Sequence, residues 1–264
     1  VQLAPALVGP EVEALVAALD DGEVLLLENS RYEAGETKND PELAKQLAAL
    51  ADLYVNDAFG SSHRAHASTE GVAHQLPAYA GLLLEREVIE LTRVRDDPEA
   101  PLVVVLGGAK VTDKIGVTDR FLETAQELLI GGAMCFSFFK AEGRDTGESL
   151  LDDESIEAAR ELLPRAEEAK ARLHLPEDLV LGREFSADTD VMELNGVDVP
   201  EGWMGLDIGA NTAAKYAKPI GAAGTVLWNG PMGAFELAPF AAGTRAVAEA
   251  VASSPGHSVV GGGD

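Results

Sequence analysis

The stretch PLVVVLGGAKVTDKIG, residues 101–116, decides the fold class of this chain. It begins with an unbroken aliphatic run, passes through two glycines and continues into a helical pattern over residues 112–126. An apolar run without alternation is typical of a strand buried on both faces of a sheet. A strand that runs through glycines into a helix is typical of α/β proteins, which bind ligands at the carboxyl ends of their strands.

The same alternation continues toward the C-terminal side. Strand patterns in ELLIGG, DLVLGREF, TVLWNGPMG and SVVGGG alternate with helical patterns over 152–171, 211–218 and 238–252. Such alternation predicts a parallel sheet with helices on both faces. The glycine loops at Gly107, Gly131, Gly230 and Gly261 are then expected to line one rim of that sheet.

The N-terminal side carries shorter elements. Helical patterns start at Pro10 and in DPELAKQLAALA, and strand patterns occur in EVLLLENSRY and DLYVNDAFG. A long helical pattern then runs from about Ala78 to Arg95, and the proline-bearing stretch DDPEAP that follows marks a domain boundary. We therefore predict an α/β chain that divides into two domains near this stretch.

Composition excludes several classes of protein. The chain has 45 Asp and Glu residues against 20 Lys and Arg, a net charge of -25, which disfavours nucleic acid and anionic membranes as partners. No apolar run approaches the 18 to 20 or so residues that span a bilayer, and the first residues lack the basic region of a signal peptide. We expect a cytoplasmic location. The single cysteine, Cys135, is expected to be a buried thiol rather than a redox or catalytic group.

Lys110 and Lys114 stand in the first turns of the helical pattern that follows the two glycines. Their spacing of four predicts that both ammonium groups share one helical face near the N-terminus, where the helix dipole disfavours cations. A bound polyphosphate would resolve that conflict, and two surface lysines are the alternative. The chain contains neither GxxxxGK[ST] nor GxGxxG followed by an acid, so an NAD-linked dehydrogenase is disfavoured.

Basic side chains also gather in the N-terminal part. DAFGSSHRAHAS holds His63, Arg64 and His66, and LLLENSRYEAGE places Arg31 just after a strand. An arginine between the histidines would repel a metal ion, whereas a guanidinium binds phosphate or carboxylate with two hydrogen bonds. An oxyanion site is therefore favoured over a metal site, with structural ion pairs as the alternative.

TVLWNGPMGAFE ends on Glu236, which can serve either as a helix cap or as the acid that takes the hydroxyls of a ribose. GWMGLDIG, residues 202–209, supplies apolar surface that suits either the cover of a base ring or simple core packing.

The motifs together resemble phosphoglycerate kinase. They are LLLENSRYEAGETKND, YVNDAFGSSHRAHAST, LGGAKVTDKI, LIGGAM, WMGLDIG, WNGPMGAFE and VVGGGD, in the order that the family has them, and they cover essentially the whole chain. The resemblance implies two doubly wound domains, residues 1–77 and 98–264, joined by a long helix at 78–97. It places 3-phosphoglycerate or 1,3-bisphosphoglycerate on the N-terminal domain and Mg-ADP or Mg-ATP on the C-terminal one. It also implies a glycolytic kinase, expected to be a monomer.

Site residues follow from the resemblance position by position. Arg31, His63 and Arg64 would bind the phosphoglycerate, Lys110 would stabilise the phosphoryl group in transit, and Lys114 would hold nucleotide phosphate. Glu236 would take the ribose hydroxyls and Asp264 would bind magnesium. The other expected nucleotide residues are Gly108, Gly131, Gly132, Gly205, Leu206, Asn229, Gly261, Gly262 and Gly263.

The chain departs from the family in three respects. Ala133 stands where a third glycine is usual, and Ser30 stands where leucine is common. The family's first hairpin, its His-Leu-Gly-Arg loop and its Ser-Thr-Gly-Gly-Gly loop have no counterpart, so the resemblance implies an internal fragment with an incomplete N-terminal domain. A non-catalytic module that binds nucleotide weakly is the alternative to an active kinase.

Overall fold

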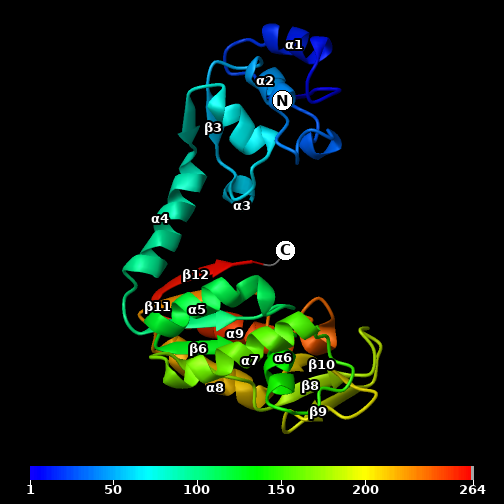
Figure 1. The fold of residues 1–264 in the computed structure, drawn as a ribbon, viewed down its shortest axis with the longest axis vertical. Helices are drawn as coiled ribbons and strands as arrows, with labels where there is room; N and C mark the ends of the chain where they lie inside the picture. Colours follow the sequence, from blue (N-terminus) through cyan, green and yellow to red (C-terminus); the bar gives the residue numbers. More distant parts are fainter. Residues whose placement is uncertain (263–264) are drawn as a thin grey trace. The chain divides into compact units, whose positions relative to one another are not determined.

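The computed structural model describes residues 1–262, apart from the side chains of residues 113 and 115. Within that range the chain forms two compact units, Val1–Thr92 and a second that starts at Arg93 (Figure 1). Each unit is α/β and contains parallel sheets, which confirms the predicted fold class.

The second unit is built around a five-stranded parallel sheet with the order β12-β11-β5-β6-β7. The strands are β5 (Leu102–Leu106), β6 (Glu127–Ile130), β7 (Arg172–His174), β11 (Thr225–Asn229) and β12 (His257–Gly261). Every side chain of β5 and β6 is buried, as the apolar runs predict for all of them except Glu127 at the start of β6. The carboxyl ends of β5, β6, β11 and β12 therefore meet at one edge, as expected from their glycine loops.

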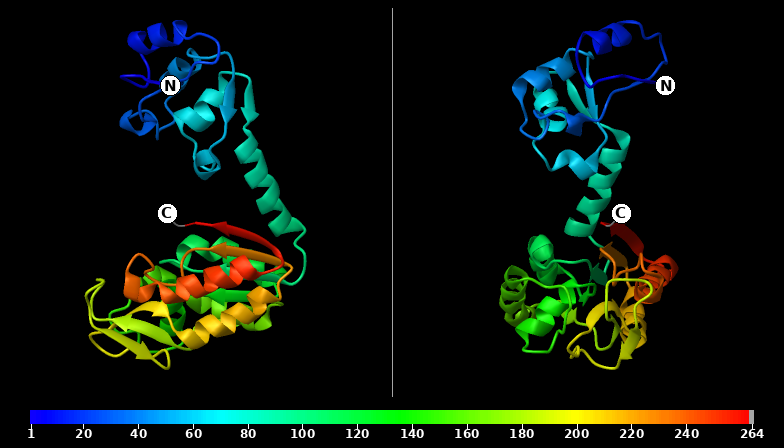
Figure 2. Two further views of the ribbon diagram at one scale, coloured as in Figure 1. Left: turned by 180° about the vertical axis from the view of Figure 1, so that it is seen from behind. Right: turned by 90° about the vertical axis from the view of Figure 1, so that its right-hand side faces the viewer.

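Helices cover both faces of this sheet. The helices α5 (Ile115–Thr124), α6 (Met134–Ala141) and α7 (Asp153–Glu168) lie on the face seen in Figure 1. The helices α8 (Ala210–Gly221) and α9 (Ala242–Ser253) lie on the opposite face, seen from behind in Figure 2. Alternate residues of β5 point into the two cores: Val104 packs in the core of the first group and Val103 in that of the second.

A second sheet in this unit is antiparallel, with the order β10-β8-β9. Its strands are β8 (Leu179–Gly182), β9 (Val191–Leu194) and β10 (Met204–Ile208). The expectation that DLVLGREF continues the parallel sheet is therefore wrong. The connection from Gly182 to Val191 is too short for a parallel crossover and allows only a hairpin.

The first unit contains two small parallel sheets. β1 (Gln2–Leu3) pairs with β2 (Leu25–Leu26), and β3 (Tyr54–Asn56) pairs with β4 (Ala78–Ala80). The predicted strand in EVLLLENSRY shortens to the two residues of β2, and Leu26 is 59% exposed. Helices α1 (Pro10–Ala17) and α2 (Pro41–Ala48) begin at prolines, and α3 (Phe59–Ser62) is a single turn. Asp40 caps α2 by accepting hydrogen bonds from two backbone amides, as its position before Pro41 predicts.

The long helix α4 runs from Leu82 to Asp96 and crosses the division between the two units. It begins later than predicted, because residues 78–80 form β4 against β3. Its first turn is capped by Asp57, whose carboxylate accepts hydrogen bonds from the amides of Leu83 at 2.8 Å and Leu84 at 3.0 Å. The cap therefore comes from the loop after β3, which the local sequence at 78–82 could not indicate.

Short helical turns lie between these longer elements. They are η1 (Ser30–Tyr32), η2 (Ala67–Gly71), η3 (Val72–His74), η4 (Thr112–Lys114) and η5 (Ala238–Phe240).

Candidate functional site

Loops at the carboxyl ends of adjacent parallel strands are joined by main-chain hydrogen bonds. The amide of Gly107 after β5 donates to Asn229 O at 3.0 Å, and that of Gly108 donates to Pro231 O at 3.0 Å. The amide of Gly132 after β6 donates to Met232 O at 2.9 Å. The three loops therefore form one connected rim.

Glycine is required at the point of closest approach in this rim. Gly132 has φ 65, and a Cβ at this position would lie 2.5 Å from Gly108 N. The next residue, Ala133, has φ -63 and caps α6 in a helical conformation. A third glycine is therefore not needed for this backbone, and the departure at Ala133 is compatible with it.

A cavity of about 860 Å³ opens beside the rim, a volume that suits a small-molecule ligand. Five of the predicted nucleotide residues line it: Gly108, Gly132, Gly205, Leu206 and Glu236. They come from four separate segments of the second unit, so the fold brings together motifs that are up to 128 positions apart (108 to 236).

The wall of the cavity at β10 depends on a glycine. A Cβ on Gly205 would lie 2.0 Å from the ring of Phe136, which itself lines the cavity. The amide of Gly205 donates to Ser149 Oγ at 2.9 Å, which fixes the strand against the loop before α7. Its neighbour Leu206 is buried and lines the cavity, so this motif serves core packing and the cavity wall at once.

Glu236 lies in the loop between β11 and η5, with an exposed side chain that lines the cavity. The interpretation as a helix cap is wrong, because η5 begins two residues later and has Leu237 at its N-cap without a side-chain cap. The carboxylate is thus presented to the cavity and is available to accept hydrogen bonds from a ligand's hydroxyl groups.

Lys114 lies at the rim rather than in the cavity lining. Its Nζ donates to Asn229 O at 3.0 Å and also to Asn229 Oδ1. Lys110 precedes η4, and α5 begins only at Ile115, so the expectation that both lysines share one face of a helix is wrong. Buried Val111 and the contact of Lys114 with Asn229 of β11 hold this segment against the sheet edge, and residues 112–114 form the separate turn η4 before α5.

The side chain of Lys110 is exposed. Asp152, the N-cap of α7, has a pKa below its ordinary value, chiefly because its carboxylate accepts a hydrogen bond from Ser155 N, with a smaller contribution from the positive charge of Lys110. The positive charge of Lys110, in the loop after β5, therefore acts on Asp152 at the N-terminus of α7.

The remaining predicted nucleotide residues lie along the strand ends. Gly131 closes β6 by donating from its amide to Leu106 O at 2.8 Å. Gly261 ends β12 in register with Asn229, and a Cβ on Gly262 would lie 2.6 Å from Asn229 Oδ1. Asn229 thus has Lys114 and Gly262 as neighbours. Gly263 and Asp264 lie outside the described residues.

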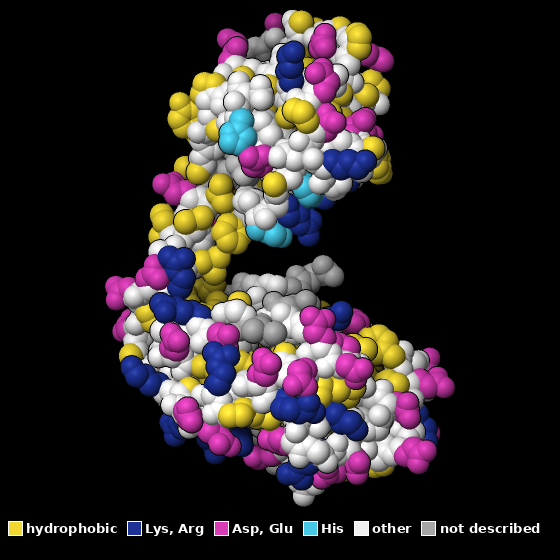
Figure 3. All heavy atoms as spheres, in the orientation of Figure 1, with side chains coloured by type: hydrophobic (Ala, Val, Ile, Leu, Met, Phe, Trp, Pro, Cys, Tyr) yellow, Lys and Arg dark blue, Asp and Glu magenta, His cyan; other side chains and the backbone are white. Residues whose placement is uncertain are grey.

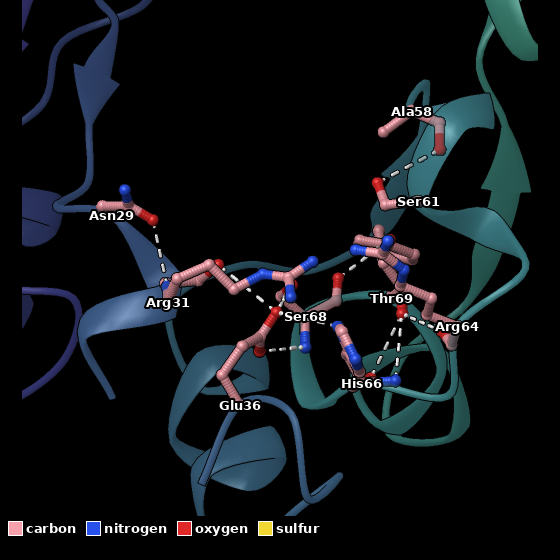
Figure 4. A network of polar contacts seen from close by, with 11 residues as sticks. Asn29, Arg31, Glu36, Ala58, Ser61, Arg64, His66, Ser68 and Thr69 are labelled. Atoms are coloured by element: carbon pink, nitrogen blue, oxygen red, sulfur yellow. Dashed lines mark hydrogen bonds and ion pairs between the residues drawn. The ribbon is translucent and has the colours of Figure 1, made fainter. Parts of the chain in front are cut away.

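The predicted phosphoglycerate residues belong to the first unit. Arg31 lies in η1, where its amide donates to Asn29 Oδ1 at 3.0 Å, and His63 and Arg64 follow α3. All three side chains are exposed. In Figure 4 the Arg31 side chain extends toward the loop that carries Arg64. Within the described part of the chain the guanidinium groups of Arg31 and Arg64 make no ion pair. The alternative that these arginines form structural ion pairs therefore gains no support.

A buried carboxylate that the sequence did not reveal organises this region. Glu36 is 1% exposed and accepts hydrogen bonds from Ser68 N at 2.9 Å, Ser68 Oγ at 2.6 Å and Ser30 Oγ at 3.3 Å (Figure 4). Ser30, the second departure from the family pattern, is thus one of the hydrogen-bond donors to the Glu36 carboxylate. The pKa of Tyr54 is raised by burial and, to a lesser degree, by the charge of Glu36.

Two other buried groups line the cavity without having been assigned to it. Burial raises the pKa of the Asp207 carboxyl to about 7, and two hydrogen bonds from backbone amides lower this pKa but do not offset the effect of burial. Burial also raises the pKa of the Cys135 thiol far above its ordinary value. The charged residue inside the apolar run WMGLDIG was the one signal in the sequence that could have identified Asp207.

The described part of the chain has neither a metal-ligand cluster nor a membrane-spanning helix. Among the described side chains, which leave out residues 113, 115, 263 and 264, no group of three or more His, Cys, Asp or Glu is arranged to hold a metal ion. No helix in residues 1–262 is long and apolar enough to cross a bilayer. On the face shown in Figure 3, acidic side chains of the second unit are interspersed with Lys and Arg.

The fold and the cavity define the second unit as a doubly wound α/β unit with a small-molecule site at its strand ends. A family model described as phosphoglycerate kinase matches residues 1–264. The chain belongs to the phosphoglycerate kinase family.

Relatives and solved structures agree with this assignment. The phosphoglycerate kinase of Moorella thermoacetica is 54% identical over 259 residues, 97% of this chain and 65% of the relative. The structure of phosphoglycerate kinase from Coxiella burnetii matches with a TM-score of 0.80 and 44% identity, over 94% of this chain and 64% of that one. The structure of phosphoglycerate kinase from Pyrococcus horikoshii matches with a TM-score of 0.83 and 32% identity, over 100% of this chain and 68% of that one. The chain thus spans about 65% of the length of the first of these relatives.

Proposed function

We propose that this chain carries the nucleotide site and part of the phosphoglycerate site of a phosphoglycerate kinase. The reaction is reversible phosphoryl transfer between 1,3-bisphosphoglycerate and Mg-ADP, which gives 3-phosphoglycerate and ATP. The observation that carries the proposal is the cavity beside the joined glycine loops, with the Glu236 carboxylate in its lining.

The nucleotide is expected to enter this cavity. Its apolar wall, which includes Gly205 and Leu206, suits a base ring, and Glu236 suits the hydroxyls of the ribose. The phosphates would extend along the rim toward Gly108, Gly132 and Lys114. Backbone amides and an ammonium group at the strand ends are the groups that bind phosphate in α/β proteins.

The phosphoglycerate is expected at Arg31, His63 and Arg64. Exposed guanidinium groups without ion pairs among the described residues are available for the phosphate or carboxylate of the substrate. In this proposal residues 1–77 are part of the phosphoglycerate-binding domain, residues 78–97 include the connecting helix, and residues 98–264 belong to the nucleotide-binding domain.

Phosphoryl transfer needs positioning and neutralisation of charge more than covalent catalysis. Lys110 would supply a positive charge to the phosphoryl group in transit, since its side chain is exposed near the cavity-lining Gly108 and Ala109. Magnesium, when bound, would neutralise phosphate charge. A carboxylate together with nucleotide phosphates suits this ion, and Asp264 stays the predicted ligand.

A second candidate function applies to the chain by itself, because it spans about 65% of the length of its first relative. The nucleotide cavity lies wholly in the second unit, whereas the predicted phosphoglycerate residues come from the first. The 264-residue chain is accordingly expected to bind nucleotide weakly and not to catalyse transfer.

Titration calorimetry with Mg-ADP on the 264-residue chain tests the nucleotide site, and no heat at millimolar nucleotide would contradict it. A coupled assay of a full-length protein that contains this sequence tests the kinase reaction. NAD gives the negative control, because the dehydrogenase alternative requires that cofactor to bind. The monomeric state and the cytoplasmic location stay predictions.

A further inference from the structure

Asp207 is a buried carboxylate at the junction of three segments around the cavity. It lies in β10, is 3% exposed and contributes to the cavity lining. Its Oδ2 accepts a hydrogen bond from Gly243 N in the first turn of α9 at 2.7 Å, and its Oδ1 accepts one from Ile208 N at 2.9 Å. The carboxylate therefore links β10 to the N-terminus of α9.

The loop that carries Glu236 packs against the same carboxylate. A Cβ on Gly233 would lie 2.3 Å from Asp207 Oδ1, so the loop backbone passes directly over it. The loop is tied to β10 by the bond from Ala234 N to Leu206 O, 2.7 Å, and to α9 by the bond from Met232 N to Thr244 Oγ1, 3.0 Å. The position of residues 231–236 thus depends on how β10 and α9 are held together.

We infer that Asp207 is a positioning residue of the nucleotide site, which sets residues 231–236 for binding by holding β10 against the first turn of α9. This inference rests on the proposed function, because it takes a nucleotide as the ligand of the cavity. Asp207 acts through the backbone of its neighbours and is not itself required to touch the ligand.

Protonation of Asp207 provides a readout that separates positioning from simple packing. The ionised carboxylate offers an acceptor to both amides, whereas the neutral acid carries a proton on one oxygen and loses one acceptor. Asp207→Asn mimics the neutral acid, since its amide nitrogen cannot accept a hydrogen bond. With a pKa of about 7, wild-type Asp207 changes between these two forms near neutral pH.

Neighbouring charges do not account for that pKa. The titratable groups on the packed segments and in the cavity lining are Cys135, Glu148, Glu236, Arg245 and Glu249. None of these groups contributes to the raised pKa, which comes from burial.

Asp178 offers a matched control. It is also buried and caps a helix from a distance: its Oδ1 accepts from Thr212 N at 2.8 Å and its Oδ2 from Asn211 N at 2.8 Å, at the start of α8. It does not line the cavity. Asp178→Asn therefore removes a comparable helix cap without affecting residues 231–236.

The experiment measures the Kd for Mg-ADP from pH 5.5 to 8.5, together with backbone hydrogen exchange, in wild-type chain and both variants. We expect Asp207→Asn to weaken binding about tenfold at pH 8, because a buried amide loses its acceptor. The ratio of the two Kd values is expected to approach one below pH 7. The amides of Met232 and Ala234 are expected to exchange faster in Asp207→Asn and to be unchanged in Asp178→Asn.

The outcomes separate the inference from the proposed function. Unchanged exchange of residues 231–236 in Asp207→Asn overturns the inference, as does a ratio of Kd values that is constant with pH. If wild-type chain binds no Mg-ADP while these amides exchange faster in the variant, the proposed function fails and the role of Asp207 in positioning the loop remains. If Asp207→Asn does not fold, Thr244→Val tests the same loop attachment, and unchanged exchange at Met232 and Ala234 there contradicts the inference.

Discussion

Lys114 joins two of the loops at the sheet edge by donating from its Nζ to the main-chain oxygen of Asn229, 3.0 Å away. Its ammonium group is thereby held at the ends of β5 and β11, where nucleotide phosphate is proposed to lie. We expect Lys114→Met to weaken Mg-ADP binding about tenfold, because a charged hydrogen-bond donor is lost from the rim.

Titration calorimetry measures this effect, and Lys218→Met serves as its control. Lys218 is exposed in the last turn of α8 and lies outside the rim, so its loss leaves the local contacts of Asn229 intact. Equal affinity in the two variants would remove Lys114 from the nucleotide site.

Lys110 is predicted to act on the phosphoryl group in transit rather than on the bound nucleotide. In a full-length enzyme, Lys110→Ala is expected to lower kcat about 100-fold or more while it changes the Kd for nucleotide only slightly. Steady-state kinetics combined with calorimetry separate the two effects. A loss of affinity as large as the loss of turnover would contradict the assignment to the transition state.

The buried carboxyl of Asp207 makes the stability of the second unit depend on pH. Its pKa rises from 3.8 to about 7 on folding, so the folded state binds this proton more tightly than the unfolded state. The stabilising contribution is complete below pH 3.8 and is lost as the pH rises through 7. Relative to Asp207→Asn, the free energy of unfolding of the wild type should fall by about 4 kcal/mol across this range.

Urea unfolding followed by tryptophan fluorescence measures this difference. Both tryptophans, Trp203 and Trp228, belong to the second unit, so the signal reports on that unit alone. A difference between wild type and variant that is constant from pH 4 to pH 8 would show that Asp207 does not titrate in this way.

Cys135 is expected to be unreactive in the folded chain, because it is 1% exposed and burial raises the pKa of its thiol. A chromogenic disulfide reagent should label it only as fast as the second unit unfolds, and rapidly in urea. Fast labelling of the native chain would show that the thiol is more accessible than its burial indicates.

Glu36 is expected to stabilise the first unit through its bonds with Ser30 and Ser68. Glu36→Gln replaces an acceptor with a donor next to the Ser68 groups, which should lower the stability of this unit by about 1 to 3 kcal/mol. Faster hydrogen exchange at the Ser68 amide would report the change, with the exposed Glu33→Gln as its control. Unchanged exchange at Ser68 would argue against a structural role for this carboxylate.

The sequence predicted those parts of the fold that depend on long apolar runs. The five residues of β5 are all buried, and their lack of alternation indicated a central parallel strand before any partner was known. The glycine loops after β5, β6 and β11 were located for the same reason, since each lies at or just beyond the end of such a run.

Features set by distant partners could not be predicted. Residues 78–80 look helical by composition and form a strand only because residues 54–56 lie alongside them. The spacing of Lys110 and Lys114 favoured a helix, whereas the contact of Lys114 with Asn229, 115 positions away, holds that segment outside it. The burial of Asp207 and Glu36 likewise arises from tertiary packing, which the pattern around each residue does not record.

Three helices of this chain take their N-terminal caps from other segments: Asp57 caps α4, Asp178 caps α8 and Asp207 caps α9. A helix that lacks a local cap gains its full stability only after the capping segment has been placed. Excised peptides for α8 and α9 should accordingly show little helix in water. The second unit is then expected to fold cooperatively, because its helices and its strands can reach their final stability only together.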